Sequence, residues 1–143
     1  MKTKYKWSLV VGFIAVLMGL TWYGYSQLGN NAPAHLLIEP GEFDFGTVNA
    51  KTETTFVMRN QGGKPLEVLG ISTSCGCTSA WADQKTILPG GRTTLYVSFD
   101  PTVHEDIEGE VFRQVYVRSN DPEQPEVTVD IKATLNSAQG TLP

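Results

Sequence analysis

"VTVDIKATL", residues 127–135, is the stretch that decides the fold class of this chain. Apolar side chains occupy every second position, namely Val127, Val129, Ile131, Ala133 and Leu135. Successive side chains of a β-strand point to opposite faces, so the stretch is predicted to be a strand with one buried face. From residue 35 onward no run carries a sustained helical period, and the alternation therefore indicates an all-β domain.

Six further runs of the same kind precede it, at residues 35–40, 43–48, 52–60, 66–73, 93–99 and 111–119. Turn residues separate them, above all the glycines and prolines of "QGGKP", "ILPGG" and "NDPEQPE". About seven short strands over roughly 100 residues predict an immunoglobulin-like β-sandwich. The residues expected inside it from the earlier runs are Phe56, Met58, Leu95, Val97, Phe99, Val115 and Val117. Two such inner faces supply a core without help from cysteines.

The first 28 residues are different in character. No charged residue occurs between Trp7 and Leu28, and a helix of about 20 such residues is long enough to cross a membrane. Three lysines precede this stretch and no charge follows until Glu39, which predicts a single-pass anchor with a cytoplasmic N-terminus. A cleaved signal peptide is the alternative, because the lysines, the apolar core and "APA" at residues 32–34 fit that description as well.

Both interpretations place the rest of the chain outside the cytoplasm, at the cell membrane in the first case. The expected organisation is an anchor over residues 1–28, a tether over 29–37, the sandwich over 38–136 and a flexible tail over 137–143. Beyond residue 34, eight basic residues stand against fifteen acidic ones, a net charge of −7. This sign argues against nucleic acid as a partner. The partners expected are the lipid bilayer, through the N-terminal helix, and another membrane or envelope protein.

"STSCGCTSAW", residues 72–81, holds both cysteines of the chain, Cys75 and Cys77. In an extended segment the side chains of residues i and i+2 lie on one face, so the two sulfurs can converge. An oxidising compartment favours pairing of neighbouring thiols. We therefore place a disulfide first, either loop-closing or redox-labile. A copper or zinc site comes second, and a bridge between two chains third.

The metal hypothesis needs ligands besides the two thiolates, which are half of a soft-metal site. His104 is the best candidate, because it lies in the connection that follows the strand ending at Phe99. We expect it to share one exposed corner with the cysteine pair. Met58 is interpreted as a core residue and His35 as part of the tether. No cofactor is assigned, and copper and zinc are the metals that this set of ligands fits.

The remaining charged residues suggest no further site. The acids Glu105, Asp106, Glu108 and Glu110 lack the spacing of a calcium loop and are interpreted as a solvated acidic segment. Arg113 and Arg118 alternate out of phase with each other and are interpreted as residues that need no ligand. The chain has no nucleophile elbow, phosphate-binding loop or zinc-protease helix motif, so an enzyme is the weaker class.

Several motifs follow one another in fixed order: "FDFGTV", the N-x-G-G-x-P-L stretch that begins at Asn60, "TSCGCT", "LPGG", "FDP" and "VRSNDPEQPEV". In this order they resemble a bacterial family of extracytoplasmic proteins, domain-of-unknown-function family 1573. The resemblance covers about residues 38–136, and its layout is similar to that of Hydin-type ASH domains. It implies an immunoglobulin-like fold and, through the ASH-like domains, a protein-binding role. The family itself implies no activity.

Two functions follow from these observations. The first is a non-enzymatic, membrane-anchored extracytoplasmic module for protein interaction or for assembly of an envelope complex. The alternative is a copper- or zinc-binding or thiol-redox protein that uses Cys75 and Cys77 together with His104.

Overall fold

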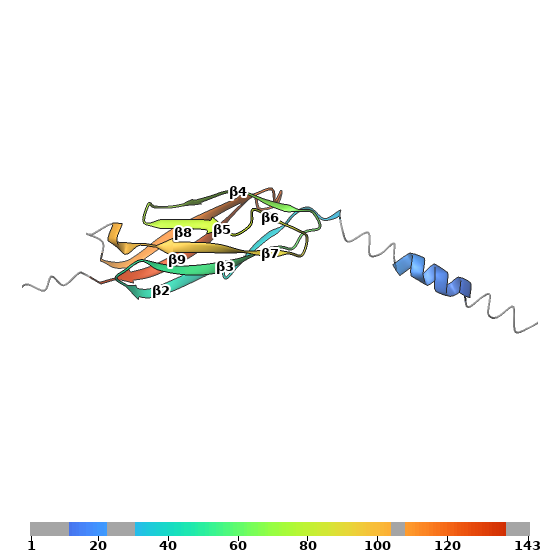
Figure 1. Cartoon of the computed structure of the whole chain (residues 1–143), viewed down its shortest axis with the longest axis horizontal. Helices are drawn as coiled ribbons and strands as arrows, with labels where there is room; N and C mark the ends of the chain where they lie inside the picture. Colours follow the sequence, from blue (N-terminus) through green and yellow to red (C-terminus); the bar gives the residue numbers. More distant parts are fainter. Residues whose placement is uncertain (1–11, 23–30, 104–107, 137–143) are drawn as a thin grey trace, which may run out of the picture. The chain divides into compact units, whose positions relative to one another are not determined.

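The computed structural model describes residues 12–22, 31–103 and 108–136, which belong to two compact units, Met1–Ala32 and Pro33–Pro143. In the first unit, residues 12–22 form a helix (Figure 1, blue). Within the described ranges, no helix combines the length and the apolar character that crossing a membrane requires. The rest of the predicted anchor, residues 1–11 and 23–28, lies outside the described residues, as does the predicted tail.

The described part of the second unit consists of strands and one short 3-10 helix (Figure 1). The strands are β1 (Leu36–Glu39), β2 (Glu42–Val48), β3 (Thr52–Asn60), β4 (Leu66–Thr73), β5 (Thr78–Ala82), β6 (Thr86–Ile87), β7 (Arg92–Phe99), β8 (Gly109–Ser119) and β9 (Glu126–Leu135). The 3-10 helix η2 (Pro101–Val103) follows β7.

These strands form two sheets in the order β1-β3-β7-β5 and β2-β9-β8-β4-β6. Neighbouring strands are antiparallel except β2 and β9, which are parallel. β1 lies at the edge of one sheet and β2 at the edge of the other, and the cis Glu39–Pro40 bond lies between these two strands. The predicted immunoglobulin-like sandwich is confirmed, with nine strands among the described residues instead of about seven.

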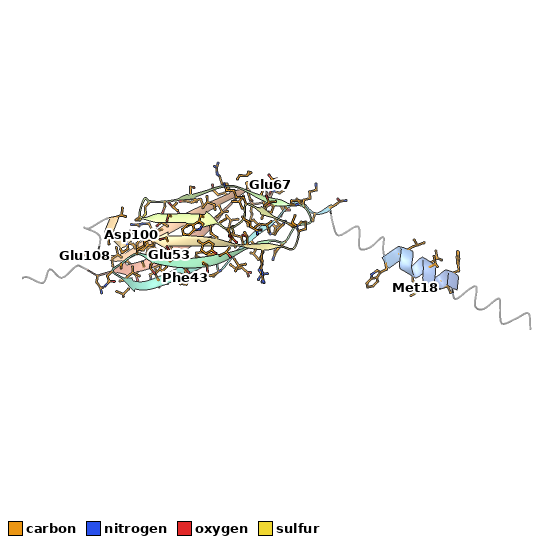
Figure 2. All side chains as sticks on the ribbon, viewed as in Figure 1. Met18, Phe43, Glu53, Glu67, Asp100 and Glu108 are labelled. Carbon is orange, nitrogen blue, oxygen red and sulfur yellow. A yellow bond between two sulfur atoms is a disulfide. The ribbon has the colours of Figure 1, made fainter. Side chains whose placement is uncertain are left out.

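The core lies between the two sheets, where side chains fill the space (Figure 2). Phe56 and Met58 of β3 are 0% exposed, the alternating residues of β7 lie beside them in the same sheet, and those of β8 and β9 belong to the opposite sheet. Every residue predicted to point inward is buried except Val127, which is partly buried at the start of β9. Alternation of apolar residues therefore identified the inner face of each of these strands correctly.

Two strands were not expected. β5, with the sequence "TSAWA", directly follows the cysteines, and β6 contains only two residues. In β5 the inward positions are Thr78, Ala80 and Ala82, whose small side chains give a weak apolar signal. β1 also begins at Leu36, inside the segment expected to be a tether, and Ala34 and Leu36 are buried in the core.

The strand register defines two opposite ends of the sandwich. Asn60, the last residue of β3, pairs with Leu36, where the chain enters the sheet, and we call this the Asp121 end. The first residue of β3, Thr52, pairs with Phe99, which in turn pairs with Thr78 next to the cysteines. We call this second end the cysteine end.

Buried hydrogen bonds close the Asp121 end. Asp121 is 1% exposed, and its carboxylate accepts hydrogen bonds from the N–H groups of Leu36 at 2.9 Å, Glu123 at 2.9 Å and Gln124 at 3.1 Å. Asn60 is also 1% exposed and donates from Nδ2 to the carbonyl oxygens of Lys64 and Ile87. The turn after β8 is thereby fastened to the start of β1, and the end of β3 is fastened to the turn that follows it and to the end of β6.

Candidate functional site

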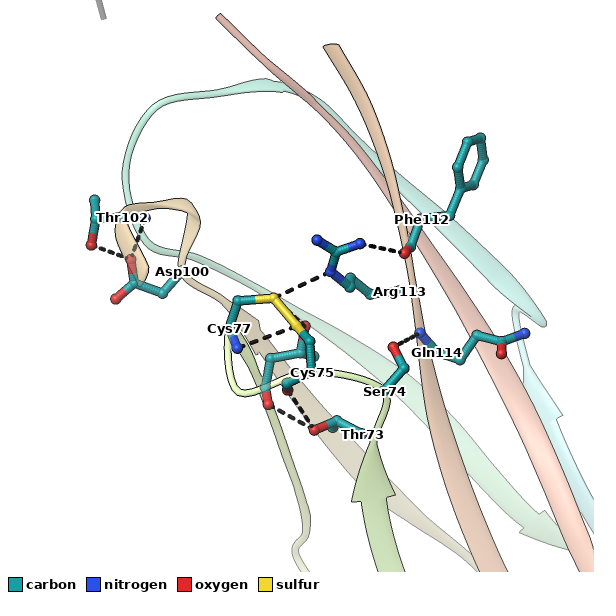
Figure 3. Close-up of a disulfide and its surroundings, with 10 residues drawn as sticks. Thr73, Ser74, Cys75, Cys77, Asp100, Thr102, Phe112, Arg113 and Gln114 are labelled. Atoms are coloured by element: carbon teal, nitrogen blue, oxygen red, sulfur yellow. Dashed lines mark hydrogen bonds between the residues drawn. A yellow bond between two sulfur atoms is a disulfide. The ribbon is translucent and has the colours of Figure 1, made fainter. Parts of the chain in front are cut away.

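The cysteines lie in the four-residue connection between β4 and β5, which backbone and side-chain hydrogen bonds hold at both ends. Thr73 Oγ1 is 3.0 Å from the carbonyl oxygen of Cys75 and 2.9 Å from that of Thr78. The N–H of Ser74 donates to the carbonyl of Gln114 on β8 at 2.9 Å. The connection is therefore a fixed turn between the two sheets (Figure 3).

Cys75 and Cys77 form a disulfide whose Cα atoms are 5.4 Å apart. The two halves of the bond differ in exposure, because Cys75 is partly buried while Cys77 is only 4% exposed and belongs to the core cluster. Cys77 therefore contributes to the core, although whether the fold depends on the cysteines stays a prediction. Gly76 between them is exposed, and a Cβ atom at this position would meet no other atom within 4 Å.

Arg113 of β8 lies against the disulfide, which the sequence interpretation missed. Its Nε donates to Cys77 Sγ at 3.2 Å and its Nη1 donates to the carbonyl oxygen of Phe112 at 2.8 Å (Figure 3). We expected Arg113 to need no ligand. It is in fact in phase with Val111 and Val115, so it lies on the inner face of its strand, at the cysteine end.

Two further donors surround the sulfurs. The N–H of Cys77 donates to Cys75 Sγ at 3.2 Å. The Thr78 hydroxyl lies 3.6 Å from Cys75 Sγ and 3.8 Å from Cys77 Sγ. Both sulfurs thus face hydrogen-bond donors, and Cys77 also faces a permanent positive charge.

The segment after β7 begins beside the cysteine turn, because the N–H of Asp100 donates to the carbonyl of Cys77 at 2.8 Å. Hydrogen bonds from the side chain and the backbone N–H of Thr102 hold the pKa of Asp100 below its usual value. Asp100 and Glu108 lie toward this end of the sandwich, and Glu67 lies nearer the other (Figure 2). His104, Glu105 and Asp106 lie outside the described residues, so the expected corner of His104 and the cysteine pair stays a prediction.

The other candidate ligands lie apart from the cysteines. Met58 is in the core, and His35 Nδ1 is 3.1 Å from Asp121 Oδ2 at the opposite end of the sandwich. His35 is therefore a side chain that packs on the domain, not a tether residue without contacts. Across the residues described here, no group of three His, Cys, Asp or Glu side chains is arranged to hold a metal ion. Both sulfurs are used in the disulfide, so neither is available as a thiolate ligand in this state.

The outer edge of β5 is a second exposed feature. Hydrogen bonds from Asp83 N to Thr94 O and from Asp100 N to Cys77 O bracket β5, so its odd-numbered residues bond to β7. In an antiparallel pair the bonding alternates, and the backbone groups of Ala80 and Ala82 consequently face away from β7. No other strand in the described ranges pairs with this edge.

An aromatic pair adjoins the edge on the outer face of the sheet. Trp81 is 45% exposed and stacks on Tyr96 of β7, with ring centroids 5.4 Å apart and an interplanar angle of 9°. A large, rigid and partly exposed aromatic surface beside unpaired backbone groups is a combination that protein partners can use.

Comparison with a family of proteins of unknown function gives a match over most of the domain. The model of the family described as "Protein of unknown function (DUF1573)" matches residues 36–135. No curated protein matches the sequence.

Solved structures share the fold. A protein of unknown function from Porphyromonas gingivalis W83 is 26% identical with a TM-score of 0.68, and the match covers 74% of this chain and 49% of that one. The Vibrio cholerae VesB protease is 14% identical with a TM-score of 0.57, covering 69% and 31%. The ASH/PapD-like domain 7 of human CEP192 is 10% identical with a TM-score of 0.55, covering 75% and 89%. This chain therefore spans about half of the first of these proteins and under a third of the second.

Proposed function

Because this chain belongs to the DUF1573 family, whose description names no activity, we propose its function from the domain itself: a non-enzymatic module that binds another protein. The observation that carries the proposal is the open edge of β5 with Trp81 beside it. The fold shared with an ASH/PapD-like domain supports an interaction role over catalysis. The resemblance to a protease covers less than a third of that chain and transfers no activity.

The edge of β5 suits the addition of a strand from a partner. Backbone groups of an added strand would pair with Ala80 and Ala82, and these hydrogen bonds supply affinity without requiring a particular sequence. Trp81 would then supply an anchor of the kind that dominates binding energy at protein interfaces. Acidic residues outnumber basic ones by seven beyond residue 34, which favours a partner segment with basic residues next to its apolar ones.

The N-terminal segment would display this module at the outer face of a membrane, where its partner would be another membrane or envelope protein. The support for this placement is the uncharged stretch from Trp7 to Leu28 and the three lysines before it. The interaction role does not depend on this placement, since the edge of β5 belongs to the second unit alone.

Site-specific photo-crosslinking in cells tests the interaction. A photoreactive residue at exposed position Ser79 of β5 should give a discrete adduct, and one at exposed position Thr128, on the other sheet, should not. Once the adduct is identified, Trp81→Ala should weaken binding of the purified partner by about tenfold or more. Phe112→Ala is the matched control, because Phe112 is 64% exposed on the outer face of the other sheet. Equal crosslinking at both positions, or equal losses in both variants, would refute the assignment.

A further inference from the structure

The disulfide is poorly explained as a device for stability. Only one residue separates its two cysteines, and cross-link stabilisation falls as the closed loop shortens, so a loop of this size is among those that gain least. The turn is already fastened by the two hydrogen bonds of Thr73 Oγ1 and by that of Ser74 N. A bond between these two sulfurs therefore adds little that the turn does not already have.

The two sulfur atoms of the disulfide have different surroundings. Cys77 Sγ is buried and accepts a hydrogen bond from the Arg113 guanidinium, whereas Cys75 is partly exposed next to the exposed Gly76. A guanidinium gains little from a neutral disulfide sulfur but forms a charge-assisted hydrogen bond with a thiolate. The two ends of the bond are thus suited to different roles, one as the sulfur that is attacked and the other as the sulfur that leaves.

We propose that Cys75 and Cys77 form a thiol–disulfide exchange site in which a substrate thiolate attacks Cys75 and Arg113 stabilises Cys77 as the leaving thiolate. This activity would add a chemical reaction to the non-enzymatic binding role proposed above, and it does not involve the edge residues Ala80 and Ala82 of β5. Its substrate is a thiol, supplied by a small molecule or by a pair of cysteines in another protein.

The exchange takes place in two steps. First, the substrate thiolate attacks Cys75 Sγ, the bond between the cysteines breaks, its electron pair passes to Cys77 Sγ, and a mixed disulfide joins the substrate to Cys75. Second, another substrate thiolate attacks the substrate sulfur of that mixed disulfide, which releases a substrate disulfide and leaves the Cys75 thiolate. Two thiols are oxidised, two electrons reduce the protein disulfide, and the two thiol protons go to the cysteines or to water. A disulfide donor restores the site by the reverse exchange.

The surrounding donors favour the forward direction. Arg113 Nε and the N–H of Cys77 each point at a sulfur that carries negative charge only after reduction. Groups that stabilise the reduced form of a pair make its disulfide a stronger oxidant, and a better-stabilised leaving thiolate leaves faster. The site therefore acts as an oxidant of thiols.

The rate of reduction of the purified full-length protein tests the role of Arg113. With millimolar glutathione under native conditions, followed by alkylation and mass spectrometry, the wild-type disulfide should open. Arg113→Gln should slow this reaction by about three- to tenfold, and Arg113→Lys, which keeps the charge, should restore most of the rate. Arg118→Gln, the same change on the exposed outer face of the same strand, should react like the wild type. Circular dichroism confirms that each variant is folded.

A spectroscopic measurement separates thiolate stabilisation from mere packing. In the reduced protein, thiolate absorbance should develop at lower pH in the wild type than in Arg113→Gln. Equal titrations and equal reduction rates in these two proteins would overturn the assigned role of Arg113. A disulfide that opens only in denaturant would overturn the exchange site altogether.

Single-cysteine variants test which sulfur is attacked. Oxidised glutathione should modify Cys75 in Cys77→Ala at least about tenfold faster than it modifies Cys77 in Cys75→Ala, because Cys77 is the buried sulfur. The opposite order would refute the assigned direction of attack. Glutathione and a reduced two-cysteine peptide distinguish the substrate sources: faster turnover with the peptide points to a protein, and equal rates per thiol point to a small molecule.

Discussion

The buried carboxylate of Asp121 accepts the hydrogen bonds that close the Asp121 end of the sandwich. Asp121→Asn puts an amide in contact with donors that now meet a carboxylate, so at least one buried N–H loses its acceptor. We expect a loss of about 2 to 4 kcal/mol in the free energy of unfolding, measured by urea denaturation. Asp83→Asn, at an exposed acid, should change the free energy by less than about 0.5 kcal/mol. Equal effects would show that the buried hydrogen bonds contribute nothing.

The ionisation of Asp121 also makes the free energy of unfolding depend on pH. Burial raises the pKa of Asp121, but hydrogen bonds from the N–H groups of Leu36, Gln124 and Glu123, and the nearby His35, outweigh it and hold the pKa below the usual 3.8. As the pH falls, the unfolded chain therefore binds a proton before the folded protein does, and stability decreases. The contribution of Asp121 is complete above the usual pKa and is lost as the pH falls through the lower, folded-state value.

Unfolding free energies between about pH 2 and pH 6 measure this effect. The difference between the wild type and Asp121→Asn should shrink as the pH falls below about 4, since the protonated wild-type carboxyl no longer accepts all of these hydrogen bonds. Asp100 also has a lowered pKa, but it is present in both proteins. The difference between their unfolding free energies therefore reports on Asp121. A difference that stays constant over this range would contradict the role of the ionised carboxylate.

Arg113 shows where reasoning from the sequence failed at the level of single residues. Its position in the alternation of β8 already placed it on the inner face, beside Val111 and Val115. A charge at such a position is easily taken for a break in the pattern, although a long side chain at the end of a buried row can reach a neighbouring turn. Whether Cys75 and Cys77 form a disulfide could not be predicted from the sequence for a different reason. Their pairing depends on how the backbone turns at Gly76.

At the scale of elements, the turn between β3 and β4 fits tightly against the segment before β1. A Cβ atom at Gly62 would overlap the backbone of Pro33 and Ala34, which are not flexible side-chain ends. Gly62→Ala should therefore destabilise the protein by about 1 to 3 kcal/mol, measured by thermal or chemical unfolding. Gly76→Ala, where no atom lies within 4 Å of the added carbon, is the control and should be nearly neutral. A neutral Gly62→Ala would mean that the segment before β1 does not pack there.

The predictability of each strand followed the size of its inward side chains. The strands β3, β7, β8 and β9 have large apolar residues at alternate positions, and their inner faces could be predicted from the sequence. β5 alternates just as regularly, but its inward residues are a threonine and two alanines, which give little contrast with a loop. The strand that bears the proposed binding edge could therefore not be predicted from the alternation of apolar residues.

At the scale of the whole molecule, the N-terminal boundary of the domain lies before β1. A protein that begins at residue 33 should unfold cooperatively with a stability close to that of the full chain. One that begins at residue 38 loses the buried Ala34 and Leu36 and the donor to Asp121, and it should be less stable by about 3 kcal/mol or more. Thermal unfolding of the two proteins measures the difference, and equal stabilities would return the boundary to residue 38.

The proposed membrane attachment is tested on cells that produce the full chain. The protein should sediment with membranes and resist extraction by salt or carbonate, and protease added from outside should degrade the second unit. A version that lacks residues 1–28 and carries a cleavable export signal should be soluble, which is the control. Recovery of a soluble mature form that begins near His35 would instead identify the N-terminal segment as a signal peptide.

Asp121 and the disulfide lie at opposite ends of the sandwich, so the length of a strand separates them. The chain enters at one end of β3, and the cysteine turn lies at the other, a distance of about 30 Å for a strand of nine residues. The proposed exchange site and the point where the chain enters the domain are therefore separated by the full length of a strand. A molecule bound at the cysteine end would not contact the hydrogen bonds of Asp121.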